Sequence, residues 1–185
     1  MKPVLITLLG KSGSGKSTIA ERLNRRYGYL QAKSYTTRPM RNDPEDENTH
    51  TFITREQIAD FKTDIVAYNE YNGNAYFVTR KMLEGCQIYV VDKEGLIQLS
   101  NNYNDKDILS IFIKCDSSIA SKRMAERGDS DEQIMKRLQY DEEAFKNCEE
   151  LCDYSISNEA QNGVNDIVDW IDGLYRYYRP KVKED

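Results

Sequence analysis

Four short apolar runs stand out along the amino-acid sequence, at residues 4–9, 88–91, 108–113 and 154–156. Apolar residues follow one another in these runs without alternating with polar ones, which indicates strands that are buried on both faces. Segments with helical spacing lie between most of them. Because strands that alternate with helices build parallel sheets, the pattern predicts an α/β fold with a parallel central sheet.

The helical segments carry apolar residues at intervals of three and four. From Ser17 onward, Ile19 and Leu23 mark the inner face of a predicted helix, and Gly28 supplies its natural stop. A wider apolar stripe over residues 163–178 predicts a C-terminal helix, which most simply packs on the sheet.

Two stretches interrupt this alternation. Residues 34–79 contain short strand-like pieces rich in Thr, Tyr and Asn, which predict a small mixed insertion. Residues 117–148 are charged and helical, and they break at Gly128 before the cap candidates Asp129 and Ser130. This second stretch predicts a helical hairpin that stands off the core.

Length and composition narrow the function classes. A chain of 185 residues with 39% hydrophobic content suits one globular domain. A net charge of -5 argues against a nucleic-acid partner, and no apolar stretch approaches the roughly 20 residues that cross a bilayer. We therefore expect a cytoplasmic protein with a small-molecule partner, and we leave a homodimer open. The four cysteines show no framework spacing and are expected as reduced thiols.

The segment GKSGSGKS follows the first predicted strand and matches the phosphate-loop pattern G-x-x-x-x-G-K-S. Its small residues let backbone N–H groups point at phosphates, and the helix that follows adds partial positive charge. We expect Lys16 to reach the β- and γ-phosphates of ATP, and Ser17 to offer its hydroxyl to Mg²⁺. The predicted ATP-binding residues are Gly10, Lys11, Ser12, Gly13, Ser14, Gly15, Lys16, Ser17 and Thr18. The alternative, a glycine turn without a ligand, does not account for the strand before it and the helix after it.

Two groups of arginines suggest further phosphate contacts. Arg38 and Arg41 lie three residues apart in a stretch with no other charge, where an anion between them would relieve their repulsion. Arg123 and Arg127 share a helix face, and Arg137 follows across the break. Either group alone would be interpreted as a solvated surface. Beside a triphosphate site, the second group predicts clamps for a transferring phosphoryl group.

Together these motifs resemble the guanylate kinase family, from about Val4 to about Tyr178. The family follows its phosphate loop with S-x-T-T-R-x-x-R, which begins here at Ser34, and with G-N-x-Y, which begins at Gly73. Its D-x-x-G element begins at Asp92. The lid pattern is matched by Arg123, Arg127, Gly128, Ile134, Arg137 and Leu138, and the late D-Y-x-I-x-N run by Asp153, Tyr154, Ile156 and Asn158.

The resemblance implies a three-layer P-loop NTPase in a single domain. Its core would comprise residues 1–33, 80–116 and 149–185, with a monophosphate-binding insertion at 34–79 and a helical lid at 117–148. The implied catalytic residues are Lys16, Arg123, Arg127 and Arg137. The implied acceptor site consists of Ser34, Arg38, Arg41, His50, Tyr76 and Asp92.

The base-reading residues of the family are altered in this sequence. The glutamate that reads the guanine edge falls on Ala67, the serine or threonine beside it on Val78, and a phosphate-binding tyrosine on His50. Alanine cannot accept the two donors of guanine, so a strong preference for GMP is not expected. Glu70 would restore a carboxylate only through a shift of the strand.

The sequence thus predicts an ATP-dependent kinase that acts on a nucleoside monophosphate, with GMP as the family default. Phosphoryl transfer needs positioning and electrostatics rather than a covalent nucleophile. The altered base pocket motivates a sugar phosphate as an alternative acceptor. A binding module without activity is the third reading, because this fold is also used as a scaffold.

Overall fold

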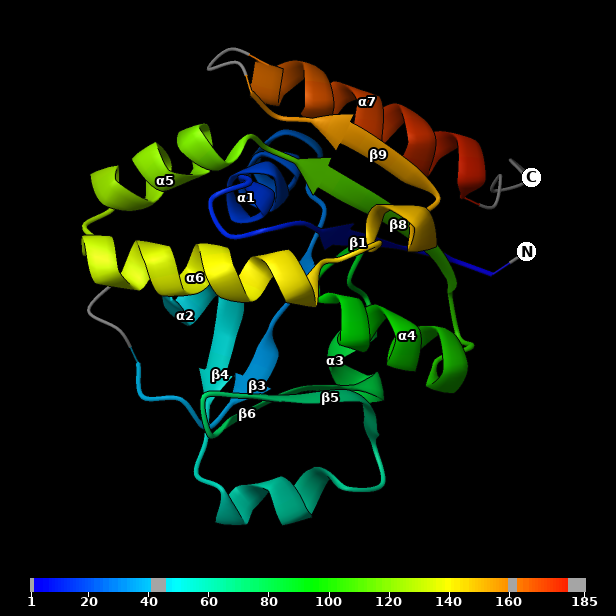
Figure 1. Ribbon diagram of the computed structural model, residues 1–185. Coiled ribbons are helices and arrows are strands. Elements are labelled where there is room, and N and C mark those ends of the chain that lie inside the picture. The colour runs from blue at the N-terminus through cyan, green and yellow to red at the C-terminus, as the bar shows by residue number, and fades with distance from the viewer. Residues whose placement is uncertain (1, 41–45, 160–162, 180–185) are drawn as a thin grey trace.

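The computed structural model describes residues 2–40, 46–159 and 163–179. Its main sheet has five strands, all parallel, in the order β2-β7-β1-β8-β9. Figure 1 labels β1, β8 and β9 of this sheet. These strands are β1 (Val4–Leu9), β2 (Gln31–Ala32), β7 (Ile88–Val90), β8 (Asp107–Lys114) and β9 (Tyr154–Ser157). The predicted α/β fold with a parallel central sheet is therefore confirmed.

Helices cover both faces of this sheet. Alternate residues of β1 point to opposite sides: Ile6 packs with α1 (Lys16–Tyr27) and α7 (Gly163–Tyr178), whereas Leu5 packs with α4 (Lys93–Asn102). Both side chains are fully buried. This burial on both faces explains why the strand is apolar without alternation. The short helix α3 (Arg80–Leu83) lies before β7 in the chain.

A second sheet of four strands is built entirely from residues 34–79, in the order β4-β3-β6-β5 (Figure 1). Its strands are β3 (Ser34–Thr36), β4 (His50–Phe52), β5 (Ile65–Tyr71) and β6 (Asn74–Thr79), with α2 (Asp46–Thr49) and the 3₁₀ helix η1 (Glu56–Phe61) between them. The β5–β6 hairpin turns at Asn72 and Gly73, both at positive φ, as an Asn-Gly turn favours. Aromatic rings of Tyr35, Phe61, Tyr68 and Phe77 pack together in this sheet.

Residues 117–148 form the expected helical hairpin, with α5 (Ser117–Glu126) and α6 (Asp131–Ala144). Ser130 caps α6 in a capping box with Gln133. The hairpin does not stand off the rest of the molecule, contrary to the expectation. The backbone N–H of Ser12 donates to Asp141 of α6, and the ring of Tyr140 packs edge-on against Tyr71 of β5, with 4.5 Å between centroids.

Two negative findings hold for the residues that the structure describes. None of their helices is long and apolar enough to cross a membrane. No group of three or more His, Cys, Asp and Glu side chains among them is arranged to hold a metal ion, and all four cysteines are free thiols. The last three elements among the described residues are the 3₁₀ helix η2 (Glu149–Leu151), β9 and α7.

Candidate active site

The phosphate loop is packed so tightly that glycine is required at its bends. Gly10 and Gly15 have φ values of 147° and 93°. A Cβ on Gly10 would lie 2.4 Å from the carbonyl oxygen of Ile113, and one on Gly15 would lie 2.3 Å from Nδ2 of Asn158. The loop therefore rests directly against the ends of the neighbouring strands, and its backbone conformation depends on glycine.

Lys16 is folded back onto the loop that precedes it. Its Nζ donates to the carbonyl oxygens of Gly10 at 2.6 Å and Lys11 at 2.9 Å. Burial lowers the pKa of Lys16 from 10.5 to about 8; the nearby carboxylate of Asp141 opposes this shift, and Arg127 adds to it. The ammonium group thus stands where an anion bound by the loop would favour its charged form.

A carboxylate of α6 already occupies one donor of the loop. Oδ2 of Asp141 accepts a hydrogen bond of 2.6 Å from the backbone N–H of Ser12, and Asp141 is only 4% exposed. Sequence reasoning did not single out this residue. The available signal was its position four residues after Arg137, which places both side chains on one helix face.

A cavity of about 230 Å³ connects the phosphate loop to the second sheet. Several residues predicted for ATP and for the acceptor line it together, namely Gly10, Ser12, Lys16, Ser34, His50, Tyr76 and Asp92. The register of β3 on β4 pairs Ser34 with His50, and Ser34 Oγ lies 2.7 Å from His50 Nδ1 in a hydrogen bond. The structure thus gathers in one place residues that lie far apart in the sequence.

Asp92 is held from two sides at the rim of this cavity. As the N-cap of α4 it accepts a hydrogen bond from the backbone N–H of Gly95 at 2.7 Å through Oδ1. Through Oδ2 it accepts one from Nδ2 of Asn69, also at 2.7 Å. Asn69 was missed by sequence reasoning, although its position two residues after Ala67 on β5 puts both on one face of the strand.

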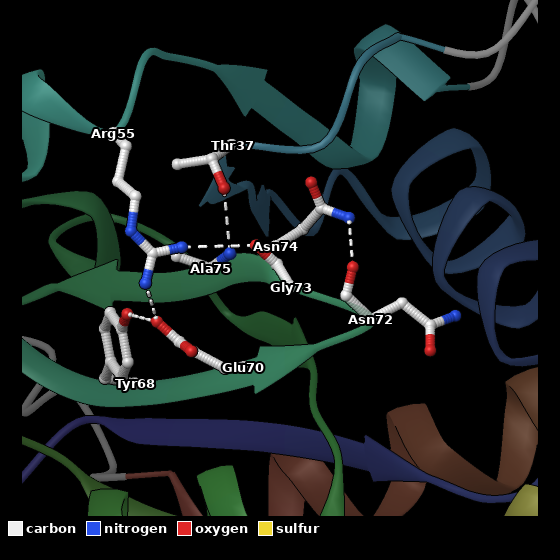
Figure 2. Close-up of polar contacts among 8 residues, drawn as sticks. All are labelled: Thr37, Arg55, Tyr68, Glu70, Asn72, Gly73, Asn74 and Ala75. Carbon is white, nitrogen blue, oxygen red and sulfur yellow. Dashed lines mark hydrogen bonds and ion pairs between the residues drawn. The ribbon is translucent and has the colours of Figure 1, made fainter.

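The residues that replace the base-reading pair lie side by side, because Ala67 pairs with Val78 across β5 and β6. Ala67 lines the cavity, whereas Val78 is fully buried in the apolar core. Glu70 is engaged elsewhere. Figure 2 shows its carboxylate bound by the guanidinium of Arg55 and by the hydroxyl of Tyr68, which donates at 2.6 Å.

The hairpin arginines have different surroundings. Arg137 lines a larger cavity of about 770 Å³, together with Ser12, Asp92 and Asp141. Arg123 donates to the carbonyl oxygens of Gly13, at 3.3 Å, and Asn158, at 3.0 Å. Arg127 forms an ion pair of 2.7 Å with Asp129 at the end of α5. Their roles in transfer stay predictions.

Three further predicted residues, Arg38, Ser17 and Thr18, line neither of these two cavities. The guanidinium of Arg38 lies over the ring of Phe52, 5.5 Å from its centroid. Arg41 lies outside the described residues. Ser17 and Thr18 are exposed at the start of α1, and Ser17 lines a separate depression with Glu21.

Comparisons with known proteins agree with this geometry. A family described as "AAA domain" matches residues 6–147. A guanylate kinase of Fusobacterium nucleatum is 27% identical over 180 residues, covering 91% of this chain and 95% of that protein. One of Carboxydothermus hydrogenoformans is 29% identical over 177 residues, covering 90% and 86%. These matches confirm the resemblance that the motifs predicted.

Solved structures share the fold. The crystal structure of guanylate kinase from Anaplasma phagocytophilum superposes with a TM-score of 0.70 at 24% identity, covering 98% of this chain and 88% of that one. An uncharacterised protein from Eubacterium ventriosum gives a TM-score of 0.52 at 17% identity, covering 93% and 98%. The predicted P-loop NTPase fold is confirmed. Because the matched residues 6–147 are well over half of its 185 residues, the chain belongs to the AAA domain family.

Proposed function

We propose that this protein is a kinase that transfers the γ-phosphoryl group of ATP to a nucleoside monophosphate. One observation carries the proposal. Ser12 and Lys16 of the phosphate loop line the same cavity as Ser34, His50 and Asp92. A triphosphate held by the loop would therefore point its terminal phosphate at an acceptor bound against the second sheet. The resemblance to proteins named guanylate kinase supports the same reaction.

The residues of this chain suit the electrostatic demands of such a transfer. The reaction proceeds by in-line displacement, and the protein chiefly positions the reactants and stabilises charge. Lys16 supplies a positive charge at the β- and γ-phosphates once it turns from the loop carbonyls. Arg137 makes no hydrogen bond or ion pair with any residue in the described part of the chain. It is therefore available to a transferring phosphoryl group.

The loop fits a nucleotide and its magnesium ion. The cradle is lined by glycines at which a side chain would collide with neighbouring groups, so phosphate oxygens could approach its backbone closely once the N–H of Ser12 is released from Asp141. Ser17, in the first turn of α1, is exposed and would offer its hydroxyl to Mg²⁺. When bound, that ion neutralises charge on the phosphates.

We also propose a division of labour along the chain. The insertion 34–79 would hold the acceptor, with Arg38, His50 and Tyr76 at its phosphate. Residues 117–148 would act as the lid. The core of residues 1–33, 80–116 and 149–185 would hold ATP. Ser34 and Tyr76 belong to β3 and β6 of the second sheet, yet they line the same cavity as the phosphate loop. The packing of the second sheet on the core therefore sets the distance between the acceptor site and the ATP site.

The proposed function is tested by measuring ATP consumption with Mg²⁺ against all ribo- and deoxynucleoside monophosphates and a few sugar phosphates. We expect at least one nucleoside monophosphate to be phosphorylated. Lys16→Ala should lower the rate about a hundredfold or more, because an electrostatic contact to the reacting phosphates is lost. Transfer to sugar phosphates alone would contradict the proposed acceptor class. Absence of any transfer, with ATP still bound, would indicate a binding module.

A further inference from the structure

Asn69 is a polar side chain of β5 that faces the proposed acceptor site. It is half-buried and lines both cavities, the one that reaches Lys16 and the one that reaches Arg137. On β5 it shares its face with Ala67, and it pairs across the hairpin with Tyr76, which lines the same two cavities. An acceptor that fills this space therefore meets an amide just beyond the apolar position at Ala67.

The orientation of this amide follows from its partner. Oδ2 of Asp92 lies 2.7 Å from the Asn69 amide, and an ionised carboxylate only accepts hydrogen bonds. The amide nitrogen must consequently face Asp92. Asp92 is itself fixed by the backbone N–H of Gly95. Within the described residues, no other hydrogen bond engages the Asn69 side chain, so its carbonyl oxygen and its second N–H are available to a ligand.

The Asn69 amide thus offers a ligand one hydrogen-bond acceptor beside one donor. It complements the edges of adenine, cytosine, uracil and thymine, each of which presents one donor next to one acceptor. Guanine also presents an acceptor, O6, next to a donor, N1–H, but its N2 amino group adds a second donor beside N1–H. The Asn69 amide could bind O6 and N1–H of guanine, but Ala67 offers no oxygen to the N2 amino group, and Glu70 is engaged by Arg55 and Tyr68.

We propose that Asn69 is the base-reading residue of the acceptor site, and that it favours nucleobases with a single donor beside an acceptor over guanine. The inference rests on the proposed function and deepens it, because it names the property of the acceptor that the site selects. A neutral amide that binds such an edge discriminates by roughly tenfold or more for each hydrogen bond. Guanine would leave one donor unpaired in a half-buried pocket.

A purely structural role makes a different prediction. If Asn69 only ties β5 to Asp92, its removal loosens the whole cavity and weakens every acceptor equally. If Asn69 reads the base, its removal penalises the preferred base and spares an acceptor without a base. Ribose 5-phosphate is that acceptor, and it serves as an internal control.

The experiment compares the wild type with Asn69→Leu and Asn69→Ser, and with Glu70→Gln as a control on the opposite face of the same strand. It measures kcat/KM for AMP, CMP, UMP, dTMP and GMP, and Kd for each of these and for ribose 5-phosphate by calorimetry. We expect the wild type to prefer a single-donor base over GMP by about tenfold or more. Asn69→Leu should bring this ratio close to one and leave the Kd of ribose 5-phosphate unchanged. Glu70→Gln should keep the wild-type ranking.

The possible outcomes separate the role of Asn69 from the proposed kinase activity. Equal losses for all acceptors, or a GMP preference that survives in both Asn69 variants, would overturn the inference. If the wild type binds monophosphates with a ranking that depends on Asn69 but transfers no phosphoryl group, the inference stands and the proposed kinase activity fails. If it binds no monophosphate, both fail. The Ser variant keeps a small polar group, so a folding defect confined to Leu does not obscure the outcome.

Discussion

The carboxylate of Asp141 and the backbone N–H of Ser12 are joined by a 2.6 Å hydrogen bond across 129 positions of sequence. The N–H belongs to the loop that would bind the phosphates of ATP, and the carboxylate comes from the proposed lid. A negative charge of the protein thus lies beside Lys16, whose ammonium it helps to keep charged. The contact must be exchanged for a phosphate oxygen if this N–H is to bind nucleotide.

Asp141→Asn should consequently bind Mg·ATP more tightly than the wild type. The amide keeps the shape of the side chain and removes the charge that repels the phosphates, a difference of about 1 kcal/mol or five- to tenfold in Kd. Calorimetry at pH 6.5, where Lys16 stays charged, measures it. Glu142→Gln, at the exposed neighbouring position, is the matched control. Weaker binding by Asp141→Asn alone would show that Asp141 assists the nucleotide.

The lowered pKa of Lys16 makes ATP binding depend on pH. Burial places the folded-state pKa near 8, below the ordinary 10.5, so the unfolded chain binds more protons between these values. The stability of the unliganded protein therefore gains a contribution as pH rises through this window. ATP favours the ammonium form, so its affinity should fall as pH rises above about 8.

Proton uptake provides the direct measurement. Calorimetry of ATP binding at pH 8.5, in two buffers with different ionisation enthalpies, should reveal uptake of a fraction of a proton by the wild type. Lys16→Met lacks the titrating group and should show less uptake. Equal uptake by both proteins would assign the proton to another group.

Gly95→Ala should damage the acceptor site without affecting the ATP site. A Cβ at this position would lie 2.5 Å from Cγ2 of Val91 and 3.0 Å from Oδ1 of Asp92. Relief of this crowding moves Asp92 and with it the amide of Asn69, so we expect a KM for the acceptor that rises about tenfold, as loss of about one hydrogen bond implies. The Kd for ATP should stay the same.

Gly173→Ala is the matched control for that substitution. Nothing lies within 4 Å of the Cβ it would add, and the residue is within α7. Alanine there should stabilise the protein by roughly 0.5 to 1 kcal/mol, because glycine is a poor helix former. A thermal unfolding scan and steady-state kinetics of both variants separate the two effects. Unaltered acceptor kinetics in Gly95→Ala would show that Asp92 does not position the acceptor.

Arg38→Ala and Arg137→Ala should differ in their kinetic signatures. Arg38 lies in the proposed acceptor site, and a contact made equally in ground and transition states changes KM. Arg137 lines the larger cavity beside Ser12 and Asp141, and a contact made only during transfer changes kcat. Steady-state kinetics with the acceptor varied at saturating ATP tests the difference. The same signature for both would refute the proposed division between insertion and lid.

Local features of this protein could be predicted from the sequence, and long-range contacts could not. The phosphate loop, β1 and α1 follow from adjacent residues, and Gly28 ends α1 where the pattern indicated. β2 and β3 were missed because these two short strands contain no apolar run. Asp141 and Asn69 were missed because their partners lie 129 and 23 positions away, so that only the packed fold reveals what they bind.

The ring contact between Tyr71 and Tyr140 has a thermodynamic consequence. It joins the end of β5, beside the proposed acceptor, to α6, whose Asp141 touches the phosphate loop. A displacement of α6 that allows ATP to bind therefore also moves the residues of β5 beside the proposed acceptor site. Sites joined in this way share a coupling free energy, which is the same whichever ligand binds first. Any change that ATP makes in the affinity for the acceptor must thus equal the change that the acceptor makes in the affinity for ATP.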